Sequence, residues 1–217
     1  MNVSDAVAER KSIRNFLDTP VGDRELQTLL EKAARAPSGG NLQPWQIYVV
    51  NGPSMERLNA HLGAQTGREQ PAYPIYPASL GEPYRSRRFK VGEDMYELLG
   101  IPREDKAARF AHLARNFTFF GAPAGFFCYV DKSMGPPQWS DLGMFLQTFM
   151  LLAQEAGLAT CAQEAWATRP NAVTSFVGAP DEQMLFCGMA IGYANPDAPV
   201  NTLKSDRDAL ATWATFL

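Results

Sequence analysis

The sequence predicts an α/β fold in which helices cover a central sheet. Short apolar segments rich in β-branched and aromatic residues alternate with longer segments in which apolar residues recur at helical spacing. This alternation is typical of proteins whose helices cover a sheet. The chain has 217 residues, of which 46% are hydrophobic, and this suits one domain with a sizeable core. We therefore expect residues 1–217 to form a single domain.

The N-terminal part of the chain predicts three helices and one strand. Ser4 is a suitable N-cap for a short helix over residues 4–10. Apolar residues then recur on one face over residues 23–36, and Pro37 ends that helix. The remaining elements are a strand over residues 45–50 and a helix over residues 54–62.

Residues 63–83 contain too many helix and strand breakers to form a regular element. Four prolines and three glycines fall in this stretch. A loop of this length in a compact domain is usually a functional lid or is disordered, and its tyrosines favour an ordered loop that covers something. Helical patterns resume over residues 86–99 and 103–117. We expect residues 63–116 to form a variable lid or insert.

The second half of the chain predicts strands over residues 124–130, 158–163 and 184–193, and helices over residues 140–156 and 168–177, the latter with Pro170 in its first turn. The helix over 140–156 is apolar on almost all sides, which predicts burial on most of them and indicates a subunit interface. The tail over 194–217 is polar and proline-rich, but it ends in large apolar residues: Leu210, Trp213, Phe216 and Leu217. Such a tail needs another surface to lie on, and a second subunit would provide one.

Charge and cysteine content exclude several classes of protein. The net charge is −3, from 20 basic and 23 acidic side chains, so we expect neither nucleic acid nor an anionic membrane as a partner. The three cysteines, Cys128, Cys161 and Cys187, form no metal-type pair and are odd in number, so we expect buried free thiols and no metal site. The charged N-terminus lacks the apolar segment of a signal peptide, and we expect a cytoplasmic protein.

The first candidate site is the basic run Arg10, Lys11, Ser12 and Arg14. Arg10 and Arg14 share a face if the helix continues, and adjacent guanidinium groups repel each other unless an anion lies between them. Arginine side chains match the oxygens of phosphate, and the Ser12 hydroxyl adds a donor. A solvated basic turn is nevertheless the commoner structure for so short a run, so the run alone does not establish a phosphate site.

The second candidate site is the segment from Pro37 to Trp45, Pro-Ser-Gly-Gly-Asn-Leu-Gln-Pro-Trp. Its two glycines permit positive φ and a close approach of the backbone to a flat ligand. Its polar groups come from Ser38, Asn41 and Gln43. An ordinary connection between a helix and a strand would have a similar composition, so composition alone leaves both interpretations open.

Together the two segments resemble the N-terminal signature of the nitroreductase family. The run Arg10 to Arg14 is followed about twenty residues later by a helix that ends in Ala-Arg-Ala and continues into Pro37–Trp45. The resemblance extends to Asp141-Leu142-Gly143 with Gly157-Leu158, to residues 161–166, to residues 188–193 and to Arg207. It does not extend to residues 63–116.

This resemblance implies an α+β fold with a mostly antiparallel sheet. It also implies an intertwined homodimer with exchanged C-terminal arms and two FMN sites in the interface. In such a site Arg10, Ser12 and Arg207 would hold the phosphate, Lys11 would lie along the ribityl chain and Arg14 would lie near the pyrimidine edge. The other subunit would contribute Pro37, Ser38, Gly39 and Asn41. Gln163, Glu164 and Ala165 would form the turn beside the flavin ring.

Two positions depart from the family pattern. Ala165 stands where the family often has glycine, and Ser205 stands where it often has lysine. Lys204, one position earlier, is the remaining candidate for that phosphate contact. In the unmatched region, ring contacts could come from Arg85, Arg87, Arg88 and Lys90, although a solvated basic helix face is the more ordinary interpretation.

The resemblance implies that hydride passes from NAD(P)H through flavin N5 to a nitroaromatic or quinone acceptor at one site, with ping-pong kinetics. Such chemistry requires no catalytic side chain, and we expect neither His61 nor His112 to be a catalyst. Tyr84, Phe119 and Phe120 are candidate walls of the substrate pocket, with core aromatics as the equal alternative. Other activities on the same scaffold remain open: a flavin reductase, a reductive dehalogenase, a flavin-consuming enzyme or a non-catalytic FMN-binding module.

Overall fold

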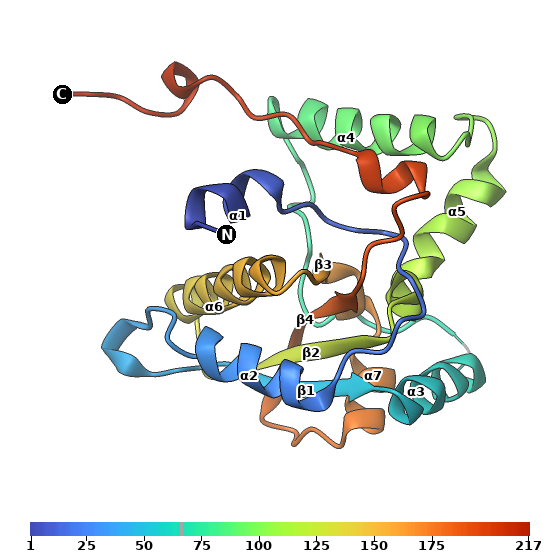
Figure 1. The fold of residues 1–217 in the computed structure, drawn as a ribbon, viewed down its shortest axis with the longest axis vertical. Coiled ribbons are helices and arrows are strands. Elements are labelled where there is room, and N and C mark those ends of the chain that lie inside the picture. Colours follow the sequence, from blue (N-terminus) through green and yellow to red (C-terminus); the bar gives the residue numbers. More distant parts are fainter. Residues whose placement is uncertain (66) are drawn as a thin grey trace.

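A four-stranded antiparallel sheet lies at the centre of the protein (Figure 1). The computed structural model describes residues 1–65 and 67–217. Its strands are β1 (Gln46–Asn51), β2 (Ala124–Asp131), β3 (Ala159–Gln163) and β4 (Gln183–Gly192), in the order β1-β2-β4-β3. Every neighbouring pair is antiparallel. This confirms the expected sheet, and β3 at its edge later forms part of the functional site.

Helices cover both faces of the sheet, which confirms the expected α/β class. Helices α2 (Asp23–Ala33) and α6 (Pro136–Glu155) pack on one face against Phe126 of β2. Helices α3 (Pro53–Ala64) and α7 (Pro170–Val177) pack on the other face, which includes Phe127. Because side chains alternate along a strand, consecutive residues of the buried strand β2 supply the two cores.

Two helices lie apart from the sheet. Helix α4 (Tyr84–Leu98) runs across one end of the molecule, and α5 (Lys106–Ala114) connects it back to the core through the 3-10 turn η2 (Arg115–Gly121) (Figure 1). No residue of α4 is buried. Residues 67–83 form neither helix nor strand, as the breakers predict, and residue 66 lies outside the described part of the chain.

Several of the expected element ends are wrong, and the helix expected over residues 23–36, for example, ends at Ala33. Helix α1 (Val3–Glu9) is capped by Asn2, whose Oδ1 accepts the Asp5 N–H at 2.9 Å, and not by Ser4. Helix α6 begins at Pro136, four residues early, because proline suits the first helical turn. Helix α5 stops at Ala114, and the segment that follows contains Phe119 and Phe120 at positive φ (49° and 56°), which no helix accommodates.

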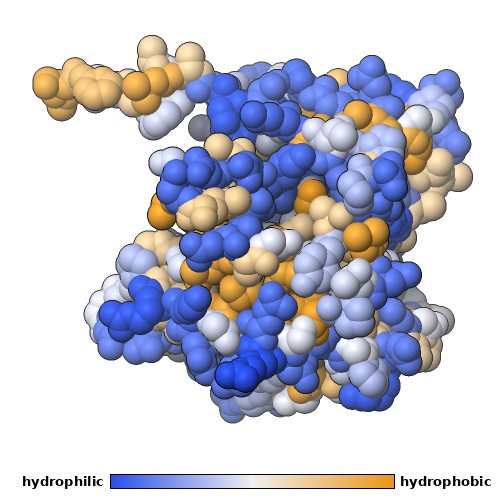
Figure 2. Space-filling model, in the orientation of Figure 1, coloured by the Kyte–Doolittle hydropathy of each residue, from blue (hydrophilic) through white to orange (hydrophobic). Residues whose placement is uncertain are grey.

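The C-terminal tail leaves the body as an extended arm. It contains the short turns η4 (Pro199–Thr202) and η5 (Leu210–Thr212) and passes along α4 before it projects outward (Figure 1). Figure 2 shows its end as a hydrophobic protrusion. Trp213 is 70% exposed and Phe216 is 85% exposed. Within this chain the tail therefore does not bury its apolar end.

Several expectations about special sites can be checked in the part of the chain that the structure describes. The three cysteines are buried free thiols, as expected. Among the described residues, no group of three or more potential ligands is arranged to hold a metal ion. No helix among them has both the length and the apolar character needed to cross a membrane.

Candidate functional site

The basic run lies along the edge strand β3. Ser12 forms a parallel bridge with Thr160, and the Ile13 N–H donates to the Thr160 carbonyl at 3.0 Å. The apolar side chain of Ile13 is buried in the core, so the polar residues on either side of it point away from the core. This pairing places Arg10, Ser12 and Arg14 beside the start of β3.

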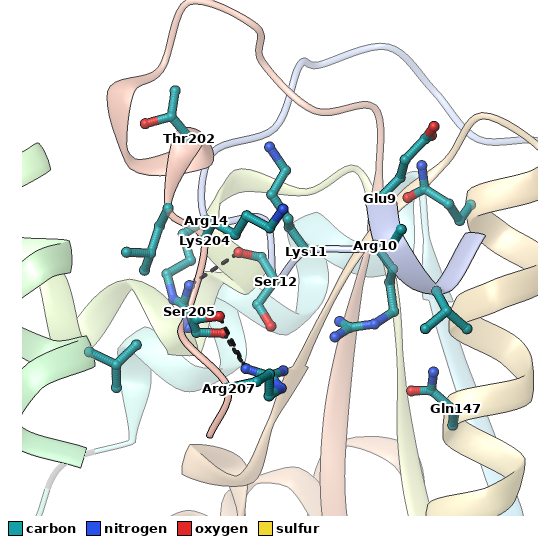
Figure 3. Close-up of a pocket in the computed structure, with 15 residues that line it drawn as sticks. Glu9, Arg10, Lys11, Ser12, Arg14, Gln147, Thr202, Lys204, Ser205 and Arg207 are labelled. Atoms are coloured by element: carbon teal, nitrogen blue, oxygen red, sulfur yellow. Dashed lines mark hydrogen bonds between the residues drawn. The ribbon is translucent and has the colours of Figure 1, made fainter. Parts of the chain in front are cut away.

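The basic run and the C-terminal tail together line a cavity of about 940 Å³. Five cationic side chains and one acidic residue, Glu9, surround it, and Ser12 and Ser205 add hydroxyl groups. Figure 3 shows Arg10 and Arg207 extending toward the space next to Ser12. Within the described residues, none of the five cationic groups forms a salt bridge: Arg10, Lys11, Arg14, Lys204 and Arg207. Such an arrangement fits a doubly charged anion such as phosphate.

A buried amide, Asn201, joins the basic run to the tail. Asn201 is 7% exposed, and its Oδ1 accepts the Arg14 N–H at 2.9 Å. Its Nδ2 donates to the carbonyls of Asn15 at 2.7 Å and Asn195 at 2.9 Å. Its own carbonyl accepts a hydrogen bond from Lys11 Nζ at 3.0 Å. Asn201 was not predicted from the sequence, because no local pattern distinguishes it from other asparagines in a polar tail.

A second cavity, of about 520 Å³, continues from the first. The two share Arg14, Val91 and Leu203. The deep end of the second cavity includes His112, Phe120 and Cys161, which are all buried, and α4 forms its roof. The protein thus contains one highly cationic cavity and an adjoining one with aromatic walls.

The Pro37–Trp45 segment lies away from both cavities. Asp141 on α6 is buried, and its Oδ2 accepts hydrogen bonds from Ser38 Oγ at 2.9 Å and from the Gly39 N–H at 3.1 Å. Gly40 and Asn41 both adopt positive φ (59° and 58°), so the segment does form the tight loop that its glycines permit. Asp141 is a second anchor that the sequence analysis missed. Within this chain, Pro37, Ser38, Gly39 and Asn41 line none of the cavities described here.

The end of β3 leads into the 3-10 turn η3 (Glu164–Thr168). Gln163 is buried, and its amide donates to the Asn116 carbonyl at 2.9 Å and accepts from Trp166 Nε1 at 3.4 Å, so its side chain is occupied within the core. Partial burial raises the pKa of the Glu164 carboxyl. Ala162 lines the second cavity, whereas Gln163, Glu164 and Ala165 line neither.

The structure separates the three expected pocket walls. Phe120 lines the second cavity. Phe119 is instead a core residue that packs on Trp166, with the ring centroids 4.8 Å apart. Tyr84 lies exposed at the start of α4, where the Arg87 guanidinium lies 5.6 Å from its ring centroid.

Comparison with known proteins identifies the relatives of this fold and site. The Nitroreductase family model matches residues 7–193. The chain belongs to the nitroreductase family. Two similar family members are the 4-nitrobenzoate reductase of Pseudomonas putida, 37% identical over 97% of this chain and 93% of that protein, and the nitrobenzene nitroreductase of Ectopseudomonas oleovorans, 34% identical over 99% and 96%. Both cover the region that the motifs left unmatched.

Solved structures show the same nitroreductase fold. An FMN- and NADPH-dependent nitroreductase from Sphigopyxis sp. strain HMH superposes with a TM-score of 0.95 at 45% identity, covering 100% of this chain and 99% of that one. The cationic cavity of this nitroreductase-family chain suits the phosphate of a flavin nucleotide, because its unpaired arginines and lysines have no carboxylate to neutralise them within the described residues. The adjoining cavity, with aromatic walls, suits flat rings.

Proposed function

We propose that this protein is an FMN-dependent oxidoreductase that uses NAD(P)H to reduce nitroaromatic or quinone acceptors. The observation that carries the proposal is the convergence of the N-terminal basic run and the C-terminal tail on one cationic cavity. The names of the relatives support the chemistry, since they include two nitroaromatic reductases and an FMN- and NADPH-dependent enzyme. Bound FMN would supply the redox chemistry, hydride transfer through N5 from NAD(P)H to the acceptor.

The residues of the cationic cavity bind and orient the cofactor in this proposal. Arg10, Ser12 and Arg207 bind the phosphate, with Lys204 close by, because forked cationic donors match its oxygens. Lys11 lies along the ribityl chain. Arg14 lies where the two cavities meet, so its charge stabilises negative charge on the pyrimidine edge of the ring.

The remaining proposed contacts come from the backbone and from a second subunit. The backbone N–H groups of Glu164 and Ala165, with Gln163 preceding them, would donate to the N5 edge of the ring. The loop formed by Pro37, Ser38, Gly39 and Asn41 reaches the cofactor of the other subunit, which agrees with its distance from the cavities of its own chain. In this arrangement the whole chain is one domain, residues 63–116 are its lid and residues 194–217 are the exchanged arm.

One site that serves NAD(P)H and then the acceptor predicts ping-pong kinetics. Parallel double-reciprocal plots with NADPH and 4-nitrobenzoate would support it, and intersecting lines would contradict it. The same assay with free FMN or a quinone as acceptor distinguishes the nitroreductase from a flavin reductase.

Cofactor binding is the decisive test of the proposed function. We expect the purified protein to bind FMN and the bound flavin to bleach anaerobically with NADPH or NADH. Arg207→Gln should weaken FMN binding by about tenfold or more, as expected for the loss of a hydrogen bond to a charged group. Arg24→Gln, an exposed change on α2, is the matched control and should bind normally. A protein that takes up no FMN would refute the proposal.

A further inference from the structure

The second cavity carries positive charge that cofactor binding does not explain. It extends from Arg14, at the wall shared with the cationic cavity, to Arg85 and Arg88 on the first turns of α4. Its volume of about 520 Å³ suits a small organic ligand. The aromatic residues along it include Tyr76, Phe89, Tyr96 and Phe120.

The first turns of α4 have an unusual charge pattern. They contain three arginines and no acidic residue, although the positive end of a helix dipole favours anions and disfavours cations. Arg85 is neutralised by Glu82, with Nη2 and Oε1 2.8 Å apart, and Arg87 pairs with Asp208. Arg88 pairs with no carboxylate in the described part of the chain. The α4 end of the cavity is its mouth. An anion there would meet the unpaired Arg88 and the positive end of the α4 dipole.

Other contacts keep Arg88 available. Its guanidinium lies 4.2 Å from the ring centroid of Tyr76, which supports the side chain without neutralising its charge. Glu93 is the acidic residue that lines this cavity, and Arg109 holds it with two hydrogen bonds of 2.5 Å and 3.0 Å. Glu93 is therefore already paired.

The deep end of the cavity contains a polar atom without a partner. His112 is 6% exposed, and its Nε2 forms no hydrogen bond with any of the described residues. Burial, with Arg115 and Arg14 nearby, lowers the pKa of His112 to about 4, so the ring is uncharged at neutral pH. A buried nitrogen without a partner is costly, and a ligand in the cavity could remove that cost. The mouth thus suits an anion, and the deep end suits an uncharged polar group.

We propose that this cavity selects acceptors that carry a carboxylate on an electron-poor aromatic ring, and that Arg88 binds the carboxylate. The proposal rests on the proposed function and specifies its substrate class. The carboxylate lies at the mouth, the ring lies between the aromatic walls, and the reducible group points toward His112 at the deep end and toward Arg14, where the two cavities meet. The relatives do not decide the matter, because one is named for an anionic nitroaromatic and one for a neutral one.

Separate measurement of the two half-reactions tests the role of Arg88. In the FMN-loaded enzyme, Arg88→Gln should lower kcat/KM for 4-nitrobenzoate by about tenfold or more, the loss typical of a hydrogen bond to a charged group, and leave kcat/KM for nitrobenzene unchanged. Arg88→Lys should recover part of the loss because it restores the charge. Flavin reduction by NADPH, followed anaerobically, should not change. Arg24→Gln controls for the loss of one surface charge.

Three outcomes would overturn the proposal. An equal fall for both acceptors would indicate a structural role for Arg88. A fall confined to the NADPH step would assign Arg88 to a phosphate of the reductant. If neither kcat/KM nor the rate of flavin reduction falls, Arg88 binds neither the carboxylate of the acceptor nor a phosphate of the reductant.

Binding of benzoate, which is not reduced, separates this proposal from the proposed function. Benzoate should perturb the absorption of the bound flavin in the unaltered protein, and Arg88→Gln should raise its Kd by a similar factor. That result supports the anion site even in a protein that reduces no nitro compound. Failure of benzoate to bind the unaltered protein refutes it.

Discussion

Among single residues, Asn201 contributes to the cationic cavity without carrying charge. Its side chain makes three hydrogen bonds, to the Arg14 N–H and to the carbonyls of Asn15 and Asn195. Asn201→Ala would leave those groups unpaired in a buried setting. We expect it to lower the free energy of unfolding by at least about 2 kcal/mol and to weaken FMN binding, because the Arg14 backbone loses its anchor, whereas the Lys11 contact with the Asn201 main-chain carbonyl stays.

Asn201→Asp refines this test. It keeps the acceptor for Arg14 but replaces the donor with an oxygen that faces two carbonyls, so we expect it to be no better than Asn201→Ala. Urea denaturation and an FMN titration measure the two effects, and Asn59→Ala on the exposed face of α3 is the control. Normal FMN affinity in both Asn201 variants would show that the anchor is dispensable.

The contrast between Arg14 and Asn201 shows which residues of the site a sequence can predict. Arg10, Ser12, Arg14 and Arg207 were predicted from the resemblance of local motifs to the nitroreductase family, and the structure brings them to one cavity. Asn201 contacts Arg14 across 187 residues of chain, and nothing near it in the sequence indicates that contact. The same holds for the contact of Asp141, whose carboxylate accepts a hydrogen bond from the Ser38 hydroxyl across 103 residues of chain.

At the scale of elements, charge pairs hold α4 to the C-terminal tail. Lys90 contacts Asp94 on its own helix and Asp206 on the tail, while Arg87 pairs with Asp208. Lys204, Ser205 and Arg207, the neighbours of these aspartates, face the cationic cavity. Lys90→Glu should therefore release the tail and weaken FMN binding by about two- to fivefold, a modest change because the pairs are exposed.

A charge exchange provides the control for α4. Adding Asp206→Lys to Lys90→Glu restores opposite charges and should restore FMN affinity, measured by fluorescence titration at low salt. The difference between the variants should shrink in 1 M NaCl, where a Debye length of about 3 Å screens exposed pairs. If the double variant binds FMN no better than Lys90→Glu, the pairing does not position the tail.

The elements also show where periodicity loses its predictive power. Strand β2 was predicted to within one residue, and the start of helix α2 was predicted correctly, because each buries a regular face against the core. Residues 115–117 were predicted as the end of a helix, but they belong to the 3-10 turn η2, in which Phe119 and Phe120 adopt positive φ and both rings are buried. Tertiary packing determines that conformation, and no local sequence pattern predicts it.

At the scale of the whole molecule, the apolar end of the C-terminal tail is exposed and is not buried against the rest of the described chain. Leu210, Trp213 and Phe216 are all exposed on an arm that projects from the body, and in the proposed dimer they lie on the partner. Burying a large apolar side chain contributes about 1.5–3 kcal/mol, so deletion of residues 209–217 should raise the dimer Kd by far more than tenfold. Arg207 remains in that variant, which separates assembly from direct loss of a phosphate contact.

Sedimentation and FMN titration over a range of protein concentrations measure dimer dissociation and FMN affinity together. If Pro37–Asn41 of the partner completes each cofactor site, the truncated protein should lose FMN affinity on dilution, in step with its dissociation into monomers. Trp213→Asp should act in the same direction with a smaller effect, because one anchor is lost instead of several. A full-length protein that is monomeric and still binds FMN tightly would refute both the arm exchange and the shared site. A truncated protein that stays dimeric would refute the arm exchange alone and would assign the interface to α6.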